Sequence, residues 1–514
     1  MKGMKSETVK NAAISALVGA TLVAGVITLA PRGGEDVTEP APGPAARGMA
    51  AVGAGAPASP AELTALIADR ERWLRAHPRD EESWAVLGSA YTERGRWLAD
   101  AAYYPRAEAA LRRSLAVLPA SAGNVDALVG LAALANARQD FTAARSWGES
   151  ARKRKPKRWT VYPALIDAYH GLGDYPAAVK ALETLQKLRP GAQTMGRTAQ
   201  SNRYQGWRED AAAAAYNAAA VAETPTEKAA ALHRMGELSW ERGEPAEAMG
   251  HYDEALRLVR DHHPSLAGRA RALAALGRTE EAFRDYQAAL GRAALPEYVL
   301  EAGELYESLG LDGDAATRYE QLRAKAGTTG VNDALVLGLL EADHGDPGEA
   351  VRLLEAEWAR KHRSVYVADA LGWALYRAGR AREALPYAKR AMDQGLRSAL
   401  FAYHRGEIER SLKQLGPARR HLAEALRINP YFSPLLAPVA EDALEAIGEP
   451  PGGGPKKVAD EEVADEEVMP VGVADPPPLP SPLPSPSPSS LPSSLPSSSP
   501  SSSPSSSPGE AGGD

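Results

Sequence analysis

The stretch LGWALYRAGRAREALPYAKRAM, residues 371–392, decides the fold of this chain. Its apolar residues recur at helical spacing on both sides of Gly379, and this pattern predicts two short helices joined by a turn at the glycine. The stretch contains no pair of side chains suited to acid, base or nucleophilic chemistry. Its alanine, leucine and glycine residues are suited to close packing, so we expect it to be a structural unit.

The same pattern recurs along the chain. A glycine is followed five residues later by an alanine, a small residue often lies seven positions before the glycine, and a bulky residue often lies four positions after the alanine. From Gly243 to Gly379 successive glycines are 34, 33, 35 and 34 residues apart. Such a period, with two amphipathic helices in each unit, is typical of a stacked array of helical hairpins. The pattern occurs at Gly173, Gly243, Gly277, Gly310, Gly345 and Gly379.

The repeat resembles the tetratricopeptide family, whose signature is W-x2-L-G-x2-Y, then A-x3-F, then P. The first unit matches it best, apart from seven extra residues around Trp97 to Tyr103, and the last unit keeps the second half. We count ten units between Glu81 and Pro430, with capping helices expected at 60–77 and 434–447. The resemblance implies an all-α, right-handed superhelical solenoid of about ten hairpins over residues 60–448. The matching residues are Trp84, Leu87, Gly88, Tyr91, Ala107, Leu111 and Pro119, and then Ala418, Leu422, Ala425 and Pro430.

The N-terminal segment, residues 1–30, contains an uncharged run of nineteen residues, AAISALVGATLVAGVITLA, at 12–30. A helix of about 20 apolar residues crosses a bilayer, so this run is just long enough to be a membrane anchor. Lys2, Lys5 and Lys10 precede it, and the positive-inside rule then places the N-terminus in the cytoplasm and the solenoid outside. A cleaved signal peptide is the alternative, although Pro31 directly follows its cleavage motif. A buried helix of a cytosolic protein is a third interpretation.

Two further segments flank the repeats. Residues 31–59 show no helical or strand periodicity and predict a flexible linker rich in Ala, Gly and Pro. Residues 449–514 contain two overlapping copies of VADEEV and then mostly Pro and Ser, which predicts a disordered tail. A wall-spanning stalk with sugars on its serines is the alternative. The tail holds ten acidic and two basic side chains, leaving 56 acidic and 57 basic ones elsewhere, so the neutral solenoid is not expected to bind nucleic acid.

The sequence offers little for catalysis. The chain has no cysteine, which excludes disulfides, thiolate metal sites and a cysteine nucleophile. It also lacks a phosphate-binding glycine loop, an HExxH helix and a GxSxG motif. His262 and His263 are predicted to lie in a surface turn between units, and Asp346 before Pro347 is predicted to begin a helix. We therefore predict no metal site, no cofactor and no enzymatic activity.

The densest charge is a basic run that closes one unit and opens the next. A solvated turn between units is the simplest interpretation. The alternative is a docking site for an anionic polymer, a lipid headgroup or the acidic tail. The run consists of Arg152, Lys153, Arg154, Lys155, Lys157 and Arg158.

In the tetratricopeptide family the first helices of the units line a concave groove that binds peptides, so the resemblance implies a partner site there. By register, Trp240 and Trp373 are turned away from the packing positions, and aromatic residues anchor peptides well. The alternative is that these tryptophans cover the contacts between units. The predicted groove residues are Asp167, His170, His233, Glu237, Trp240, Glu304, Glu307, Asp369, Trp373, Tyr376, Tyr403, Glu407 and Arg410.

Together these patterns predict a non-catalytic protein–protein interaction scaffold, anchored in the cell membrane with its solenoid outside the cytoplasm. The chain resembles membrane-anchored or exported repeat proteins of high-GC actinobacteria. The first alternative is a soluble binder that is secreted after signal cleavage, and the second is a regulatory subunit of an envelope enzyme. The expected partner is a protein or peptide.

Overall fold

The computed structural model describes residues 42–327 and 330–449, and in these ranges every regular element is helical. The predicted anchor at 12–30 lies outside the described residues, as does the tail from residue 450 onward. Among the helices that are described, none is long and apolar enough to cross a membrane.

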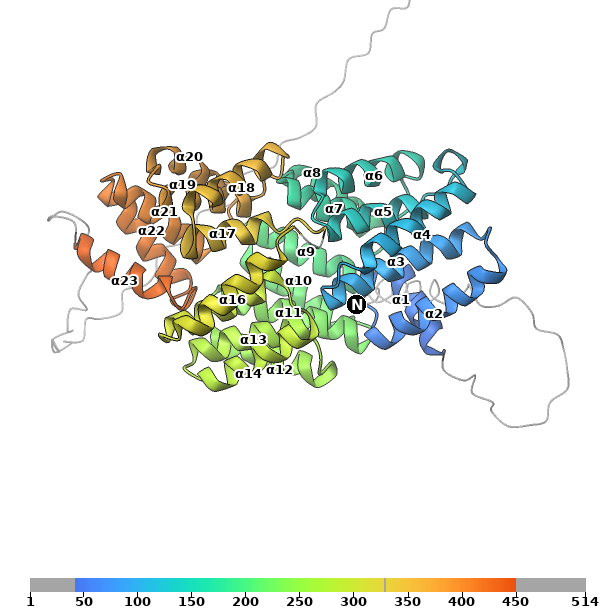
Figure 1. The fold of residues 1–514 in the computed structure, drawn as a ribbon, viewed down its shortest axis with the longest axis horizontal. Coiled ribbons are helices and arrows are strands. Elements are labelled where there is room, and N and C mark those ends of the chain that lie inside the picture. The colour runs from blue at the N-terminus through green and yellow to red at the C-terminus, as the bar shows by residue number, and fades with distance from the viewer. Residues whose placement is uncertain (1–41, 328–329, 450–514) are drawn as a thin grey trace, which may run out of the picture. The chain divides into compact units, whose positions relative to one another are not determined.

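Twenty of the helices pair into ten hairpins, one for each predicted unit, which confirms the all-α solenoid (Figure 1). A short 3-10 turn, Ala120–Ala122, follows the first hairpin. In order, the hairpins are α3 (Glu81–Leu98) with α4 (Tyr103–Val117), α5 (Asp126–Ala137) with α6 (Phe141–Arg154), α7 (Val161–Leu172) with α8 (Tyr175–Leu188), α9 (Ala192–Tyr204) with α10 (Arg208–Ala220), α11 (Pro225–Glu241) with α12 (Pro245–Leu258), α13 (His263–Ala275) with α14 (Thr279–Arg292), α15 (Pro296–Ser308) with α16 (Asp312–Lys325), α17 (Ala334–His344) with α18 (Pro347–Ala359), α19 (Val365–Arg377) with α20 (Ala381–Met392), and α21 (Ala399–Ser411) with α22 (Leu415–Ile428).

Three more helices flank the hairpins. α2 (Pro60–Ala76) and α23 (Leu436–Ile447) match the two predicted capping helices. α1 (Pro44–Ala54) was not predicted, because its alanines, glycines and prolines read as linker. Pro44 begins it, Gly55 ends it in a left-handed turn, and Arg47 donates to Glu62 of α2 at 2.9 Å. The linker prediction is therefore wrong for residues 44–54.

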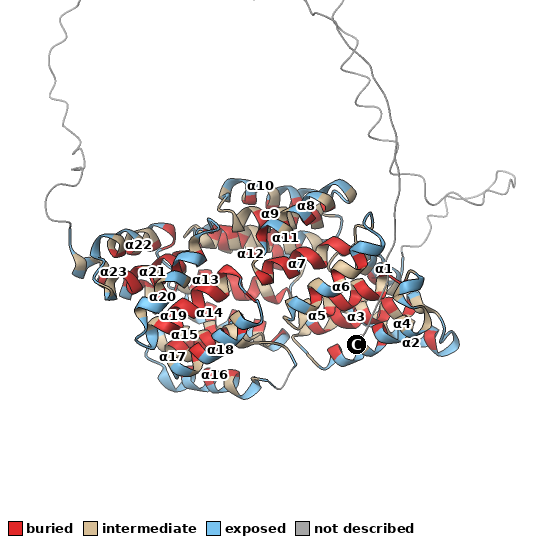
Figure 2. Ribbon diagram, turned by 90° about the horizontal axis from the view of Figure 1, so that it is seen from above, coloured by how far each residue is buried: buried red, intermediate tan, exposed pale blue. Residues whose placement is uncertain are grey.

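The small and large residues of the repeat pack as the pattern predicts. A Cβ placed on Gly303 of α15 would lie 2.5 Å from the ring of Tyr319, so the glycine makes room for the tyrosine of α16. Gly372 of α19 likewise lets the backbone of α20 approach, because a Cβ there would lie 3.1 Å from the amide nitrogen of Ala388. Buried residues accordingly run along the helices throughout the array (Figure 2).

The array also coils back on itself, which the sequence did not predict. In the third, fourth and fifth units, the end of the first helix and the turn after it pack on the loop that follows the eighth, ninth and tenth unit, respectively, and we call this contact the seam. Gly173, in the turn of the third unit, lies against the backbone of Arg363 after the eighth unit. Gly206 and Gly395 repeat this contact one unit further on. In the fifth unit the carbonyl of Trp240 accepts a hydrogen bond of 2.8 Å from Asn429, which follows the tenth unit.

The extra residues of the first unit make a related contact. Trp97 lies with its ring centre 6.0 Å from that of His262 and 5.4 Å from that of His263. Both histidines are buried, which corrects the prediction of a surface turn. Their burial follows from the coiling of the array, because Trp97 belongs to the first unit and the histidines follow the fifth.

Candidate functional site

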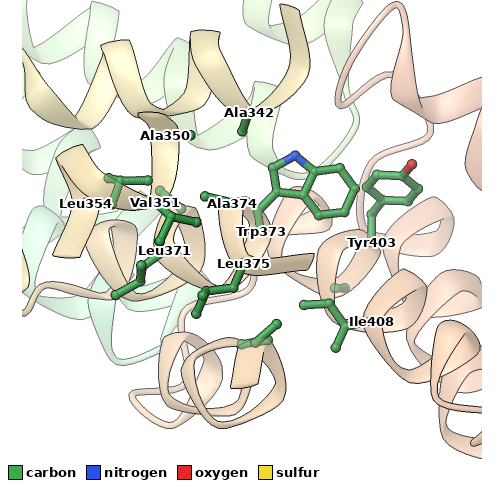
Figure 3. Close-up of a cluster of buried hydrophobic side chains, with 14 of the residues drawn as sticks. Ala342, Ala350, Val351, Leu354, Leu371, Trp373, Ala374, Leu375, Tyr403 and Ile408 are labelled. Atoms are coloured by element: carbon green, nitrogen blue, oxygen red, sulfur yellow. The ribbon is translucent and has the colours of Figure 1, made fainter. Parts of the chain in front are cut away.

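Trp373 on α19 is buried, with 2% of its surface exposed. Its indole N–H donates to Asp343 of the preceding unit at 2.9 Å, and its ring stacks on His404 of the following unit with 4.0 Å between ring centres. Figure 3 shows the indole beside Ala342 and Tyr403. The prediction that Trp373 is turned away from the packing positions is therefore wrong, because the indole fills the space between three successive first helices.

The neighbouring groove residues also take part in contacts between units. Asp369 and Glu407 are each 3% exposed. Asp369 lies 2.9 Å from Nδ1 of His404, and Glu407 accepts a hydrogen bond of 3.4 Å from the hydroxyl of Tyr376 on α19. A partner could reach these carboxylates only if α19 and α21 separated. The predicted residues in this group are Asp369, Tyr376, Tyr403, Glu407 and Arg410.

Predicted residues on α11 and α15 lie in a row of charged side chains that continues from unit to unit. Arg271 of α13 donates to Glu237 at 2.7 Å and lies 3.4 Å from Glu301. Arg271 and Glu301 were not among the predicted groove residues, although Arg271 follows Glu237 by 34 residues, the length of one repeat. We call this row the acidic ladder, and it consists of Glu237, Arg271, Glu301, Glu304, Glu307 and His344.

The far end of the acidic ladder is organised by His344 at the end of α17. Its Nδ1 lies 3.0 Å from Glu307, and its Nε2 lies 3.7 Å from Glu304. Burial alone would lower the pKa of His344, but the hydrogen bond and negative charge of Glu304 outweigh it and raise this pKa. Burial also raises the pKa of Glu304.

The acidic ladder is partly open to solvent. The side chains of Glu237, Arg271 and Glu301 are 29%, 23% and 30% exposed. Burial raises the pKa of Glu301 to about 7. Burial would also raise the pKa of Glu237, but the adjacent Arg271 outweighs this effect and lowers the pKa to about 2. With four carboxyl groups against one arginine and one histidine, the ladder has an excess of acidic groups.

The remaining predicted residues of α11 are close to the ladder. Burial lowers the pKa of His233 to about 4, so its ring is neutral at pH 7. Trp240 is half-buried, with the guanidinium of Arg271 at 5.7 Å from its ring centre. The tryptophan therefore contacts the ladder through its ring and the seam through its carbonyl.

Asp167 and His170 of α7 line a different feature, a cavity of about 330 Å³ at the seam. The opposite wall includes Glu357, His362 and Tyr366, which belong to the eighth and ninth units and the loop between them. Asp167 is exposed and pairs with Arg197 at 3.2 Å, whereas His170 is buried and its pKa is lowered to about 4 by that burial. These two predicted groove residues thus line the seam cavity, whereas the acidic ladder lies on α11, α13, α15 and α17.

The basic run lies at the end of α6 and in the turn before α7, and most of it is exposed. Arg152 pairs with Glu149 at 2.7 Å, and Arg158 pairs with Asp126. Arg154 donates to the carbonyl of Ala120 at 3.0 Å. Lys153, Lys155 and Lys157 are exposed, and their side chains form no hydrogen bond or ion pair with any residue that the structure describes.

No group of three or more metal-ligating side chains occurs within residues 42–327 and 330–449. His262 lies 2.8 Å from the Ser265 hydroxyl and His263 lies 3.1 Å from the Tyr298 hydroxyl. Asp346 caps α18 by accepting from the amide of Gly348 at 2.8 Å.

Comparison with known proteins gives a tetratricopeptide-repeat match to residues 370–431, which run from within α19 to just past the end of α22. No curated protein matches the chain. The chain is similar to the solved structure of the APC/C hetero-tetramer Cut9–Hcn1, with 13% identity, a TM-score of 0.39, and 76% of this chain and 84% of that one covered. A human IFIT1 dimer with PPP-AAAA is similar at 16% identity and a TM-score of 0.39, over 61% and 72% of the chains. Pseudomonas aeruginosa PilF is similar at 18% identity and a TM-score of 0.32, over 41% and 95%.

Proposed function

We propose that this protein is a non-catalytic protein–protein interaction scaffold that holds an extended partner segment along the acidic ladder. Tetratricopeptide-type repeats generally serve as interaction scaffolds, and the family match within the solenoid supports this class of function. Stacked hairpins present one side chain after another at a regular spacing, which suits the recognition of an extended chain.

The acidic ladder is the observation that carries the proposal. Its side chains are ordered by contacts between units, yet they keep part of their surface in solvent. The excess of carboxyl groups favours a partner segment with lysine or arginine side chains. An incoming cation would also lower the raised pKa of Glu301 and ionise it, because an opposite charge stabilises the carboxylate. The ladder is therefore assigned to a basic segment of a partner protein.

A fluorescent peptide of alternating lysine and alanine tests this assignment by anisotropy with the full chain. The double substitution Glu304→Gln and Glu307→Gln removes two charges and keeps side-chain acceptors for Tyr319 and His344. We expect it to weaken binding by about 10-fold. Glu320→Gln on the outer helix α16 is the matched control, since that carboxylate is well exposed and lies outside the ladder. If the double variant and the Glu320→Gln control bind the peptide with equal affinity, the acidic ladder is not the binding site.

We further propose that residues 12–30 anchor the protein in the cell membrane, with the solenoid outside the cytoplasm. The support is the uncharged run with lysines before it. Fractionation of cells followed by N-terminal sequencing of the mature protein tests this. A soluble protein that starts near Pro31 would instead support secretion, and constant co-purification with one envelope enzyme would support a regulatory subunit.

A further inference from the structure

A groove with a volume of about 540 Å³ lies at the N-terminal end of the solenoid, on α2, α3 and α4, apart from the acidic ladder and the seam cavity. Its apolar lining includes Leu74 of α2, and Trp84, Leu87 and Tyr91 of α3. The indole N–H of Trp84 donates to the carbonyl of Pro78 at 3.1 Å, which fixes the ring. Leu74, Leu87 and Tyr91 are buried beneath the groove, and the half-buried ring of Trp84 is the large apolar side chain that it presents to solvent.

Three arginines also line this groove. Arg106 lies 4.7 Å above the ring of Tyr91 and 3.4 Å from Glu71, the one acidic residue of the lining. Arg75 and Arg113 are exposed, and neither forms an ion pair or hydrogen bond with any residue that the structure describes. Arg106 and Arg113 are seven residues apart, so they lie on the same face of α4, separated by about 10 Å. Two cationic groups of the groove are therefore without a counter-charge.

The charge of the surrounding repeats has the same sign. Residues 60–190 hold 20 basic and 15 acidic side chains, whereas residues 191–448 hold 32 basic and 37 acidic ones. The near-neutral solenoid therefore consists of a basic part, which contains this groove, and an acidic part, which contains the acidic ladder. A field of this kind steers an anionic segment toward the first units.

We propose that the groove on α2, α3 and α4 is a docking site for an acidic, extended segment of a second partner protein. Carboxylates of the segment pair with Arg75, Arg106 and Arg113, and small apolar side chains between them contact Trp84. Trp84, which is half-buried, offers an apolar contact that a peptide can use and a purely anionic polymer cannot. The assignment to a separate protein rests on the proposed scaffold function, since a scaffold that joins two proteins needs two sites.

The labelled peptide VADEEVADEEV tests the groove, because its carboxylates alternate with small apolar residues. It is added to the full chain, and its anisotropy is compared with that of VANQQVANQQV, in which every carboxylate is an amide. We expect binding of the acidic peptide only, weakened by raised salt. The double substitution Arg75→Gln and Arg113→Gln is expected to weaken it by about 10-fold. Ala109→Glu, which adds a carboxylate to the exposed rim, is expected to weaken it similarly.

Arg112→Gln is the matched control, because Arg112 is 62% exposed on the same helix, pairs with Glu108 and does not line the groove. Equal loss in this control, or unchanged binding in the double variant, would overturn the proposal. Equally tight binding of inorganic polyphosphate would make this a general anion site and would also overturn it. The Lys/Ala peptide for the acidic ladder should bind all of these variants normally, so failure of one site is distinguishable from failure of the other.

The chain itself contains VADEEVADEEV at residues 458–468. A full chain in which the carboxylates of this stretch are changed to amides is therefore measured as well. Unchanged affinity for the added peptide supports a separate partner. Clearly tighter binding would overturn that assignment, because it would mean that the chain's own segment competes for the groove.

Discussion

Val365 donates its backbone N–H to the phenolic oxygen of Tyr175 at 3.0 Å, across 190 positions of the sequence. Val365 is the first residue of α19, and the first amides of a helix lack partners within it. Ser364 satisfies the amide of Val367 locally, so α19 begins with one cap from its own loop and one from the third unit. The seam is thus part of how the ninth unit folds.

Gly173 provides a test of the seam, with Gly379 as its matched control. Both glycines have positive φ, at 73° and 78°, so an alanine strains the backbone about equally at either site. A Cβ at Gly173 would overlap the carbonyl of Arg363, whereas a Cβ at Gly379 would meet nothing. We expect Gly379→Ala to cost about 1 kcal/mol. Gly173→Ala should cost clearly more and increase the radius of gyration in X-ray scattering; equal effects would mean that the seam is open in solution.

Trp373→Ala is expected to destabilise the solenoid by about 3–5 kcal/mol, because it leaves a cavity between three first helices and removes one of the hydrogen-bond donors to Asp343, the other being Arg377. Trp207→Ala is the control, since Trp207 is 52% exposed, and it should change stability by less than about 0.5 kcal/mol. Urea unfolding measures both. A small effect of Trp373→Ala would mean that the indole is not part of the core.

His263 should make the protein sensitive to acid. Burial lowers its pKa to about 4, whereas in the unfolded chain the ring titrates near its ordinary value of 6.5. Between these values the unfolded chain binds more protons, so stability is lost as the pH falls from 6.5 toward 4. His263→Gln should remove about 2 kcal/mol of the difference in unfolding free energy between pH 7 and pH 5. An unchanged difference would show that the ring is not buried as a neutral group.

Glu301 should have the opposite effect to His263 on the pH dependence of stability. Its pKa is raised by burial from 4.5 to about 7, so the folded protein binds more protons between these values and stability falls as the pH rises through them. Glu301→Gln is therefore expected to stabilise the protein by about 1 kcal/mol at pH 8 relative to pH 5. Melting temperatures of both proteins at the two pH values provide the measurement, and a stabilisation of the same size at both would contradict the assignment.

The repeat units could be predicted from the sequence because their contacts are local. Gly303 and Tyr319, or Gly372 and Ala388, lie within one hairpin, so a 34-residue period was enough to find ten units and the caps α2 and α23. The helix α1 was not predicted, because it depends on packing against α2 more than on its own composition.

The burial of Trp373, His262 and His263 could not be predicted in the same way. The repeat register correctly placed Trp373 on the first helix of its unit. It did not show that the first helices before and after this one lie close enough to bury the indole between Asp343 and His404. The seam joins residues about 190 positions apart, and no periodic signal in the sequence marks such a pair. Which groove positions stay accessible depends on these distant contacts.

The seam also bears on how such a chain can change over generations. Tandem repeats often gain or lose whole units through duplication or deletion, and an open array tolerates this because each unit touches only its neighbours. In this array Gly173, Gly206 and Trp240 contact the loops that follow the eighth, ninth and tenth units, respectively. Duplicating one unit between the fifth and the eighth would shift all three pairings at once, whereas a unit added at either end would leave them in place. Changes in the number of units are therefore expected at the two ends of the array.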